Sequence, residues 1–169
     1  MPQPRTTNRM IVRTAQRGDA GAVAALSAQL GHDEAVDEIG RRIEEIRAQG
    51  TGEVYVAVVP PDIVVGWVQV FGLLLVELPP LAEVGGIVVD SRYRRIGVGR
   101  SLMEAAEQWA RQNGLATLRL RSNAQRDGAH AFCRRLGLPF GVNVESLTNR
   151  KIEIDTSIDL VREIRNLLG

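Results

Sequence analysis

Four arginines and two glycines cluster where an apolar segment gives way to a helical pattern. They are Arg92, Arg94, Arg95, Gly97, Gly99 and Arg100. Backbone N–H groups in the first turn of a helix have no acceptor within the helix and carry the positive end of its dipole. Glycine lets such a turn approach an anion closely, because no Cβ stands in the way. The spacing therefore indicates a pyrophosphate site, or else a strand–helix turn with solvated arginines.

Other common phosphate and metal sites fit this sequence poorly. No glycine is followed by Lys and then Ser or Thr, as a Walker-type nucleotide site requires. The third glycine of the dinucleotide-binding fingerprint would fall at Leu102. With one cysteine, Cys133, and two histidines, His32 and His130, the chain is not expected to assemble a closed zinc site. No metal is therefore expected.

The flanking segments alternate between strand-like and helix-like patterns. Strands are expected at 11–14, 54–59, 63–76, 81–89 and around 118–120, with weaker ones at 142–147 and 151–154. Helices are expected at 19–30, from 36 to the glycine at 50, at 96–112, 127–136 and 159–168. Gly85 and Gly86 interrupt the fourth strand, which is typical of a bulge or of a weak strand centre. This order predicts a mixed α/β layered fold.

Composition narrows the class of protein further. The 169 residues carry 21 basic and 20 acidic side chains, a net charge of +1. This length fits one domain, and this charge gives no reason to expect nucleic acid or a membrane surface as partner. The apolar stretch 63–78 is valine-rich and shorter than the ~20 residues of a membrane helix. The N-terminus lacks the apolar core of a signal peptide, and the single cysteine is compatible with the cytosol, so a cytoplasmic protein is expected.

The run Val89–Met103 resembles the acetyl-CoA-binding motif of the GNAT superfamily of N-acetyltransferases, in which Arg or Gln precedes Gly-x-Gly/Ala after the fourth strand. A second set of residues is similar to the family's fifth strand and the helix after it: Ser122-Asn123, Arg126, Ala129-His130, Phe132-Cys133 and Leu136-Gly137-Leu138. Both motifs stand in family order and at family spacing, and the resemblance covers about residues 11–140. It implies a mixed, mostly antiparallel sheet with strands 4 and 5 parallel and splayed, and helices on both faces.

The resemblance implies acetyl-CoA as the cosubstrate. Its pantetheine arm would lie between strands 4 and 5, and its pyrophosphate would lie on the amides of residues 95–100. The residues implied for this site are Ile87, Val88, Val89, Arg94, Arg95, Ile96, Gly97, Val98, Gly99, Arg100, Asn123 and Phe132.

Two residues are candidates for catalysis. Glu83 matches the stretch that supplies the general base in some members, and strand alternation places it on the face of Ile87. A surface or ion-paired glutamate explains it equally well. Cys133 stands where the family's usual general acid is a tyrosine; a thiol can donate a proton, but a small core residue is the alternative. Water, Ser122, Tyr93 or no residue at all could serve instead.

The expected reaction moves an acetyl group from acetyl-CoA to a primary amine by direct attack in a ternary complex. Six acids against three arginines between His32 and Gly50 favour a small cationic amine or a protein amine, although a solvated helix face explains them equally well. Tyr55, Trp67 and Phe71 line the acceptor side or fill the core. Because the usual tyrosine is missing, a noncatalytic acyl-CoA-binding or sensing domain is the alternative.

Three regions are expected along the chain. Residues 1–9 form a flexible tail, 10–155 the acyl-CoA-binding N-acetyltransferase domain, and 156–169 a C-terminal helix that packs on the domain or makes a dimer contact. Many members of the family pair through their C-terminal strands, which makes a homodimer a candidate assembly.

Overall fold

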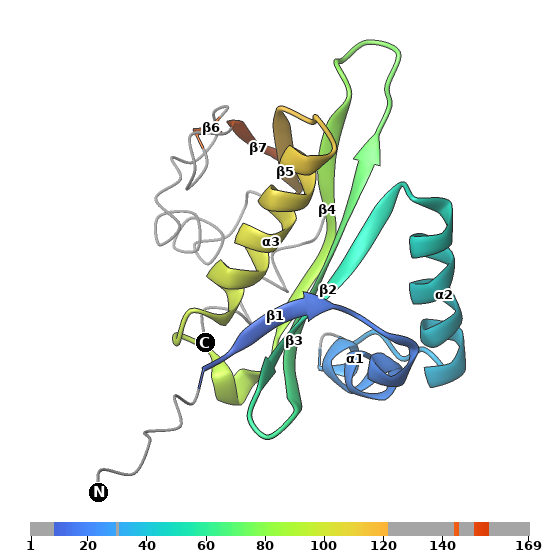
Figure 1. Ribbon diagram of the computed structural model, residues 1–169, viewed down its shortest axis with the longest axis vertical. Coiled ribbons are helices and arrows are strands. Elements are labelled where there is room, and N and C mark those ends of the chain that lie inside the picture. Colours follow the sequence, from blue (N-terminus) through green and yellow to red (C-terminus); the bar gives the residue numbers. More distant parts are fainter. Residues whose placement is uncertain (1–8, 30, 122–143, 146–150, 156–169) are drawn as a thin grey trace, which may run out of the picture.

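The structure, a computed structural model, describes residues 9–29, 31–121, 144–145 and 151–155. Its elements, labelled in Figure 1, are β1 (Ile11–Thr14), η1 (Arg17–Asp19), α1 (Ala20–Ala28), α2 (Val36–Gln49), β2 (Gly52–Val59), β3 (Ile63–Leu73), β4 (Leu81–Val89), η2 (Ser91–Tyr93), α3 (Val98–Gln112), β5 (Thr117–Arg121), β6 (Val144–Glu145) and β7 (Lys151–Asp155). The expected tail at 1–9 falls outside these residues except for Arg9. The expected helices at 127–136 and 156–169 lie outside them altogether.

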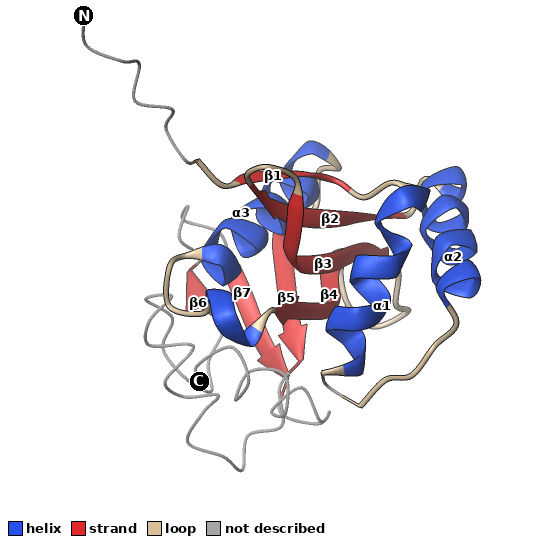
Figure 2. Ribbon diagram, turned by 90° about the horizontal axis from the view of Figure 1, so that it is seen from below, coloured by secondary structure: helices blue, strands red, loops and turns tan. Residues whose placement is uncertain are grey.

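A single sheet organises the molecule, with the strand order β1-β2-β3-β4-β5-β7-β6. Strands β1 to β4 pair antiparallel, and β4 pairs with β5 in parallel. Helix α3 covers one face of the sheet, and α1 and α2 cover the other (Figure 2). The predicted fold class is therefore confirmed. A second parallel pair, β5 with β7, was not among the expectations.

Two apolar clusters, one on each face, hold these layers together. In β2, Val54, Val56 and Val58 pack against α1 and α2, whereas Ala57 joins the cluster under α3. This alternation follows from the two-residue period of a strand. Helix α2 is amphipathic, and it ends at Gly50, which adopts a left-handed φ of 68° that glycine tolerates.

Several predicted boundaries were wrong by a few residues: β2 starts at Gly52 rather than 54, and two further differences have a clear structural reason. Strand β3 ends at Leu73 rather than 76, because Leu74 and Val76 turn outward into an exposed hairpin loop. Helix α3 starts at Val98 rather than 96, because Arg95 and Gly97 adopt φ values of 62° and 91° that a right-handed helix excludes. No helix among the described residues is long and apolar enough to cross a membrane.

A bulge in β4 corrects the predicted orientation of Glu83. Gln69 of β3 lies opposite Gly86 and Val70 lies opposite Val84, so Gly85 has no partner across the pair. This extra residue reverses the alternation. Ala82 and Val84 therefore share the α3 face with Ile87 and Val89, and Glu83 lies on the opposite face, towards α1 and α2. The predicted bulge is confirmed, and the prediction that Glu83 shares a face with Ile87 was wrong because it ignored that bulge.

Candidate functional site

The site is built around the point where β4 and β5 separate. The two strands pair only over Ala82–Val84 and Leu118–Leu120, while β4 continues to Val89. Beyond the bulge, no described strand pairs with the β5-facing edge of Gly86–Val89. Backbone polar groups along that edge can therefore bind an extended ligand in the way a further strand would. The predicted residues Ile87, Val88 and Val89 form this edge.

Gly85 and Gly86 have no side chains, which leaves room for neighbouring residues to pack against the bulge. A Cβ on Gly86 would lie 2.8 Å from Cη2 of Trp67, and one on Gly85 would lie 3.1 Å from Cε1 of Phe71. Both contacts lie on the face of α1 and α2. The glycines therefore allow aromatic side chains of β3 to lie directly over the bulge.

The arginine-rich loop joins the end of β4 to α3. The N–H of Ser101 donates to the carbonyl of Gly97 at 3.0 Å, which closes the first turn of the helix. The amides of Val98, Gly99 and Arg100 therefore have no acceptor inside α3. These amides are among those of residues 95–100 that the resemblance implies for a pyrophosphate, and Gly97 just before them has a left-handed backbone.

The arginines of this loop are not equivalent. Arg92 donates from Nη2 to Oδ2 of Asp90 at 2.8 Å and from Nε to Oδ1 at 3.2 Å. These bonds hold the pKa of Asp90 below its ordinary value, although burial acts against them. The Nε of Arg94 is buried and has no hydrogen-bond partner among the described residues. Burial lowers the pKa of Arg94 from its ordinary value, and the charge of Asp90 partly offsets this effect. An anion beside Arg94 would satisfy that buried donor.

A buried ion pair spans the two strands where they part. Nε of Arg119 on β5 donates to Oε2 of Glu83 on β4 at 2.6 Å, and Nη2 contacts the same oxygen. Only 9% of Glu83 and 6% of Arg119 is exposed. Sequence analysis did not identify Arg119. Its signal was a charged residue between Leu118 and Leu120, but Arg121 continues the same alternation, which is typical of an ordinary half-exposed strand.

A pocket of about 310 Å³ opens between α1, α2 and the bulge. Its lining residues are Val23, Ser27, His32, Glu34, Ile39, Arg42, Ile43, Ile46, Val54, Trp67, Gln69, Gly85 and Gly86. Trp67 belongs to this pocket, whereas Tyr55 packs on the opposite face against the α3 cluster. Glu83 lies on the same face as the pocket, next along β4, but is not in its lining.

The described structure thus brings together most of the predicted site. The β4 edge, the loop and the start of α3 adjoin one another. Glu83 lies beside the bulge on the face of the sheet that α1 and α2 cover. Asn123, Phe132, Cys133 and the alternative acid Ser122 lie outside the described residues.

Comparison with known structures finds the same fold in acetyltransferases. Aminoglycoside 6'-N-acetyltransferase AAC(6')-Ih from Acinetobacter baumannii is 20% identical over 76% of this chain and 90% of that chain, with a TM-score of 0.67. An acetyltransferase from Trypanosoma brucei is 18% identical over 79% of this chain and 95% of that chain, with a TM-score of 0.64. Aminoglycoside N-acetyltransferase AAC(6')-Iy, in complex with CoA, is 18% identical over 80% and 91%, with a TM-score of 0.68. At such identities the likeness shows a common fold.

Sequence comparison supplies the family. No curated protein matches the chain. The model of the acetyltransferase (GNAT) family matches residues 25–138, which include the β4 edge, the arginine-rich loop and α3. The resemblance inferred from the two motifs is therefore confirmed: the chain belongs to the GNAT acetyltransferase family.

Proposed function

We propose that the protein transfers an acetyl group from acetyl-CoA to a primary amine by direct attack within a ternary complex. The observation that carries this proposal is the separation of β4 from β5 at the Gly85 bulge. Beyond it, the edge of β4 has no partner strand among the described residues, and β4 leads through the arginine-rich loop to the first amides of α3. A long ligand with amide groups and a pyrophosphate matches both features.

The residues present suit acetyl-CoA. The edge of Ile87–Val89 would bond the amides of the pantetheine arm. The amides of residues 95–100 would hold the pyrophosphate, with Arg94 supplying a buried donor that has no partner among the described residues. Arg92 is already engaged by Asp90, so it would shape the loop rather than bind phosphate. Asn123 and Phe132 stay predicted contacts.

The amine would reach the thioester from the other face of the sheet, through the pocket between α1 and α2. Attack by its lone pair on the thioester carbonyl forms the C–N bond and places negative charge on the carbonyl oxygen. A backbone N–H of Val88 or Val89 would stabilise that charge. Collapse of the adduct then breaks the C–S bond and releases the CoA thiolate.

Proton transfer requires a base and, for the thiolate, an acid. Glu83 is our candidate base, acting through water, because it lies on the acceptor face beside the bulge. Arg119 would then be a positioning residue that fixes the carboxylate. Cys133 keeps its predicted place as a candidate acid, with water as the alternative.

A noncatalytic acyl-CoA-binding or sensing domain is the alternative function, favoured by a cysteine where tyrosine is usual. The two can be separated by measuring both acetyl-CoA binding and thiol release with a panel of amines. If the protein is a transferase, thiol release should require the amine, and the amount of N-acetylated product should equal the amount of thiol released. Tight acetyl-CoA binding without product from any amine would overturn the enzyme proposal and leave the binding domain.

A further inference from the structure

We infer that the acyl acceptor is a monoamine with a compact apolar body rather than a polycationic amine. This inference rests on the proposed acetyl transfer and concerns the class of amine that the pocket between α1, α2 and β4 admits.

Polar residues (Ser27, His32, Glu34, Arg42 and Gln69) line part of that pocket, and most of the rest of its wall is formed by aliphatic side chains. Three elements supply them: α1 contributes Val23, α2 contributes Ile39, Ile43 and Ile46, and β2 contributes Val54. The indole of Trp67 adds a flat aromatic surface next to the bulge. A space of about 310 Å³ with such walls fits a phenyl ring or a branched alkyl chain with a short amine arm.

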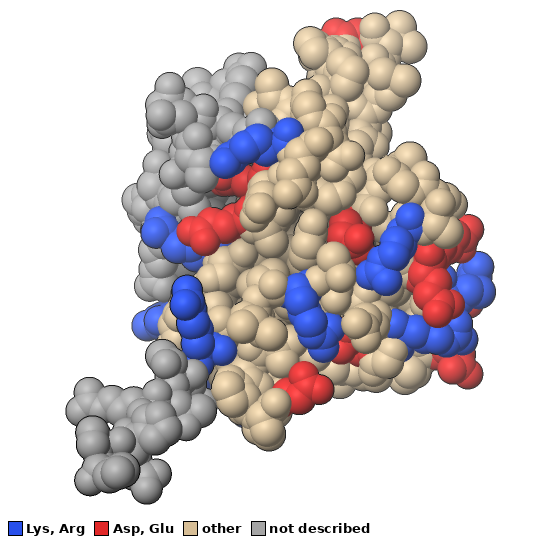
Figure 3. Space-filling view, in the orientation of Figure 1, with Lys and Arg blue, Asp and Glu red and all other residues tan. Residues whose placement is uncertain are grey.

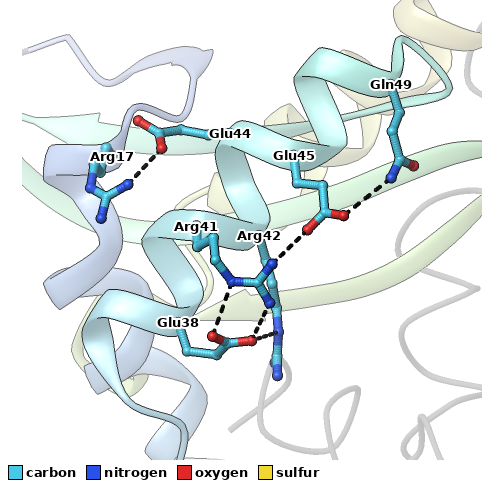
Figure 4. A network of polar contacts seen from close by, with 7 residues as sticks. All are labelled: Arg17, Glu38, Arg41, Arg42, Glu44, Glu45 and Gln49. Carbon is cyan, nitrogen blue, oxygen red and sulfur yellow. Dashed lines mark hydrogen bonds and ion pairs between the residues drawn. The ribbon is translucent and has the colours of Figure 1, made fainter.

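The acidic side chains of α2 do not give the pocket a negative charge. Glu38 pairs with Arg41 and Arg42, Glu45 pairs with Arg41, and Glu44 pairs with Arg17 (Figure 4). The one carboxylate among the described lining residues is Glu34, and it lies 3.3 Å from Nη2 of Arg42, which also lines the pocket. Figure 3 shows the same mixture of acidic and basic groups along this side of the molecule. Four of the six acids between His32 and Gly50 (Glu34, Glu38, Glu44 and Glu45) therefore contact arginines, and no acid of α2 is in the pocket lining.

The pocket lining includes two neutral side chains that can accept a hydrogen bond from an amine, Gln69 and Ser27. Gln69 lies against the bulge, since a Cβ on Gly85 would be 3.3 Å from its Oε1. The hydroxyl of Ser27 already donates to the carbonyl of Val23 at 2.8 Å, so its remaining capacity is that of an acceptor. One amino group fits here, beside the proposed thioester. A further ammonium group would have to lie among isoleucines and valines, where an unpaired charge is strongly disfavoured, or beside Arg42, whose own charge opposes it and already pairs with Glu34.

The test compares amines of the two kinds at saturating acetyl-CoA. We expect kcat/KM for 2-phenylethylamine and 3-methylbutylamine to exceed that for spermidine and neamine at least tenfold. The variant Ile46→Asp should remove that preference, because it introduces an unpaired carboxylate into the apolar wall. Ala48→Asp is the matched control: it adds the same charge at an exposed position of α2 outside the pocket lining, so the preference should stay.

Binding gives a readout that does not depend on turnover. 2-Phenylethylamine should change tryptophan fluorescence in the wild type and in Ala48→Asp, but much less in Ile46→Asp, and the signal should vanish in Trp67→Phe. Preferred transfer to spermidine or neamine would overturn the inference and keep the proposed function. Amine binding with this pattern but no transfer would overturn the proposed function and keep the pocket assignment. If the apolar amines neither bind nor become acetylated, the inference is overturned.

Discussion

Arg94 and Arg92 are two residues apart in the same loop, yet the fold gives them different surroundings. Arg92 lies mostly in solvent and binds Asp90, whereas Arg94 is half-buried with its Nε unpaired among the described residues. A buried donor without a partner is costly unless a ligand supplies the acceptor. Arg94 is therefore the arginine of this loop that we expect to contribute most to binding an anion.

Arg94→Gln should weaken acetyl-CoA binding by about 10- to 100-fold, the effect of losing one or two charge-assisted hydrogen bonds. Isothermal titration calorimetry measures this directly. Arg111→Gln, at the other end of α3, removes the same charge and should change the affinity less than threefold. Equal losses in both variants would show that only the net charge matters and would contradict a specific site at Arg94.

A catalytic role of Glu83 can be separated from its structural role, because its ion-pair partner Arg119 is known. Glu83→Gln removes the carboxylate that pairs with the buried Arg119, which should cost about 3–5 kcal/mol of folding free energy. If Glu83 is the base, transfer should also fall ~100-fold or more. The double variant Glu83→Gln with Arg119→Gln removes both charges and should recover much of the stability but none of the rate.

Arg119→Gln completes that comparison, since it keeps the carboxylate and should retain more activity than Glu83→Gln. Denaturant unfolding and steady-state kinetics on the four proteins give the answer. Recovery of the rate in the double variant would show that Glu83 acts only by holding the strands together.

Asp19 makes a testable contribution to stability outside the site. Arg13 binds it at 2.8 and 3.0 Å, and the N–H of Gln16 donates to it at 2.7 Å. The bonds from Arg13 hold the pKa of Asp19 below its ordinary value, against the effect of burial. The stability that the Asp19 carboxylate contributes to the fold is therefore complete above the unfolded-state pKa of about 3.9. It is lost as pH falls through the lower pKa of the folded state.

Asp19→Asn should accordingly lower the free energy of unfolding by about 1–2 kcal/mol at pH 7. The difference from the wild type should shrink steadily below about pH 4, because the wild-type carboxylate is then protonated too. Urea titrations between pH 3 and pH 7 measure both curves. A difference that stays constant over this range would contradict the assigned ion pair.

At the scale of elements, the bulge in β4 organises the site. It turns Glu83 towards α1 and α2, ends the pairing with β5 and brings Gly86 under the ring of Trp67. Because a Cβ on Gly86 would be 2.8 Å from that ring, either the indole or the strand must move to accept one.

Gly86→Ala should therefore destabilise the fold by about 1–3 kcal/mol, in the range found for overpacked cores. Gly21→Ala is the control, because a Cβ there meets nothing within 4 Å and lies in α1. It should be neutral or stabilise the fold by up to ~1 kcal/mol. Thermal unfolding of the two variants compares them directly, and a stable Gly86→Ala protein would contradict the close packing at the bulge.

Local patterns were enough to predict most elements, because each depends on its own residues. Helix α2 follows from the spacing of Val36, Ile39 and Ile43 before Gly50, and β4 was predicted with its observed bounds. The start of α3 was missed because a left-handed Arg95 has no sequence signature. The orientation of Glu83 was missed because alternation holds only within an unbroken strand.

At the scale of the whole molecule, an apolar hairpin extends beyond the sheet between β3 and β4 (Figure 1). Leu74 is 81% exposed and Val76 is fully exposed. The loop from residue 74 to 80 carries a single charged residue, Glu77, and Figure 3 shows this end of the molecule as almost entirely uncharged.

Replacing both exposed residues, as Leu74→Ser with Val76→Ser, should change the free energy of unfolding by less than about 0.5 kcal/mol, because neither side chain is buried. Val70→Ser in the buried part of β3 is the control and should cost more than ~2 kcal/mol. Thermal unfolding at two protein concentrations checks both. A large, concentration-dependent loss in the tip variant would mean that another molecule covers the hairpin.

The candidate site was predictable only where one short segment builds it. The loop from Arg92 to Arg100 could be identified because its glycines and arginines are adjacent in sequence. The Glu83–Arg119 pair could not, since the register of two parallel strands joined by a helix is set by packing rather than by spacing. The pairing of Glu34 with Arg42 at the acceptor pocket joins the segment before α2 to the helix, and that too is a property of the fold.

The central claim is that this fold passes an acetyl group from acetyl-CoA to an amine. Its most direct test is mass spectrometry of the amine after incubation with acetyl-CoA carrying a deuterated acetyl group, with free thiol measured in parallel. We predict one labelled acetyl group per amine and an equal amount of released CoA, with both lost together in Glu83→Gln. Unlabelled amine after prolonged incubation with a protein that binds acetyl-CoA would contradict the claim.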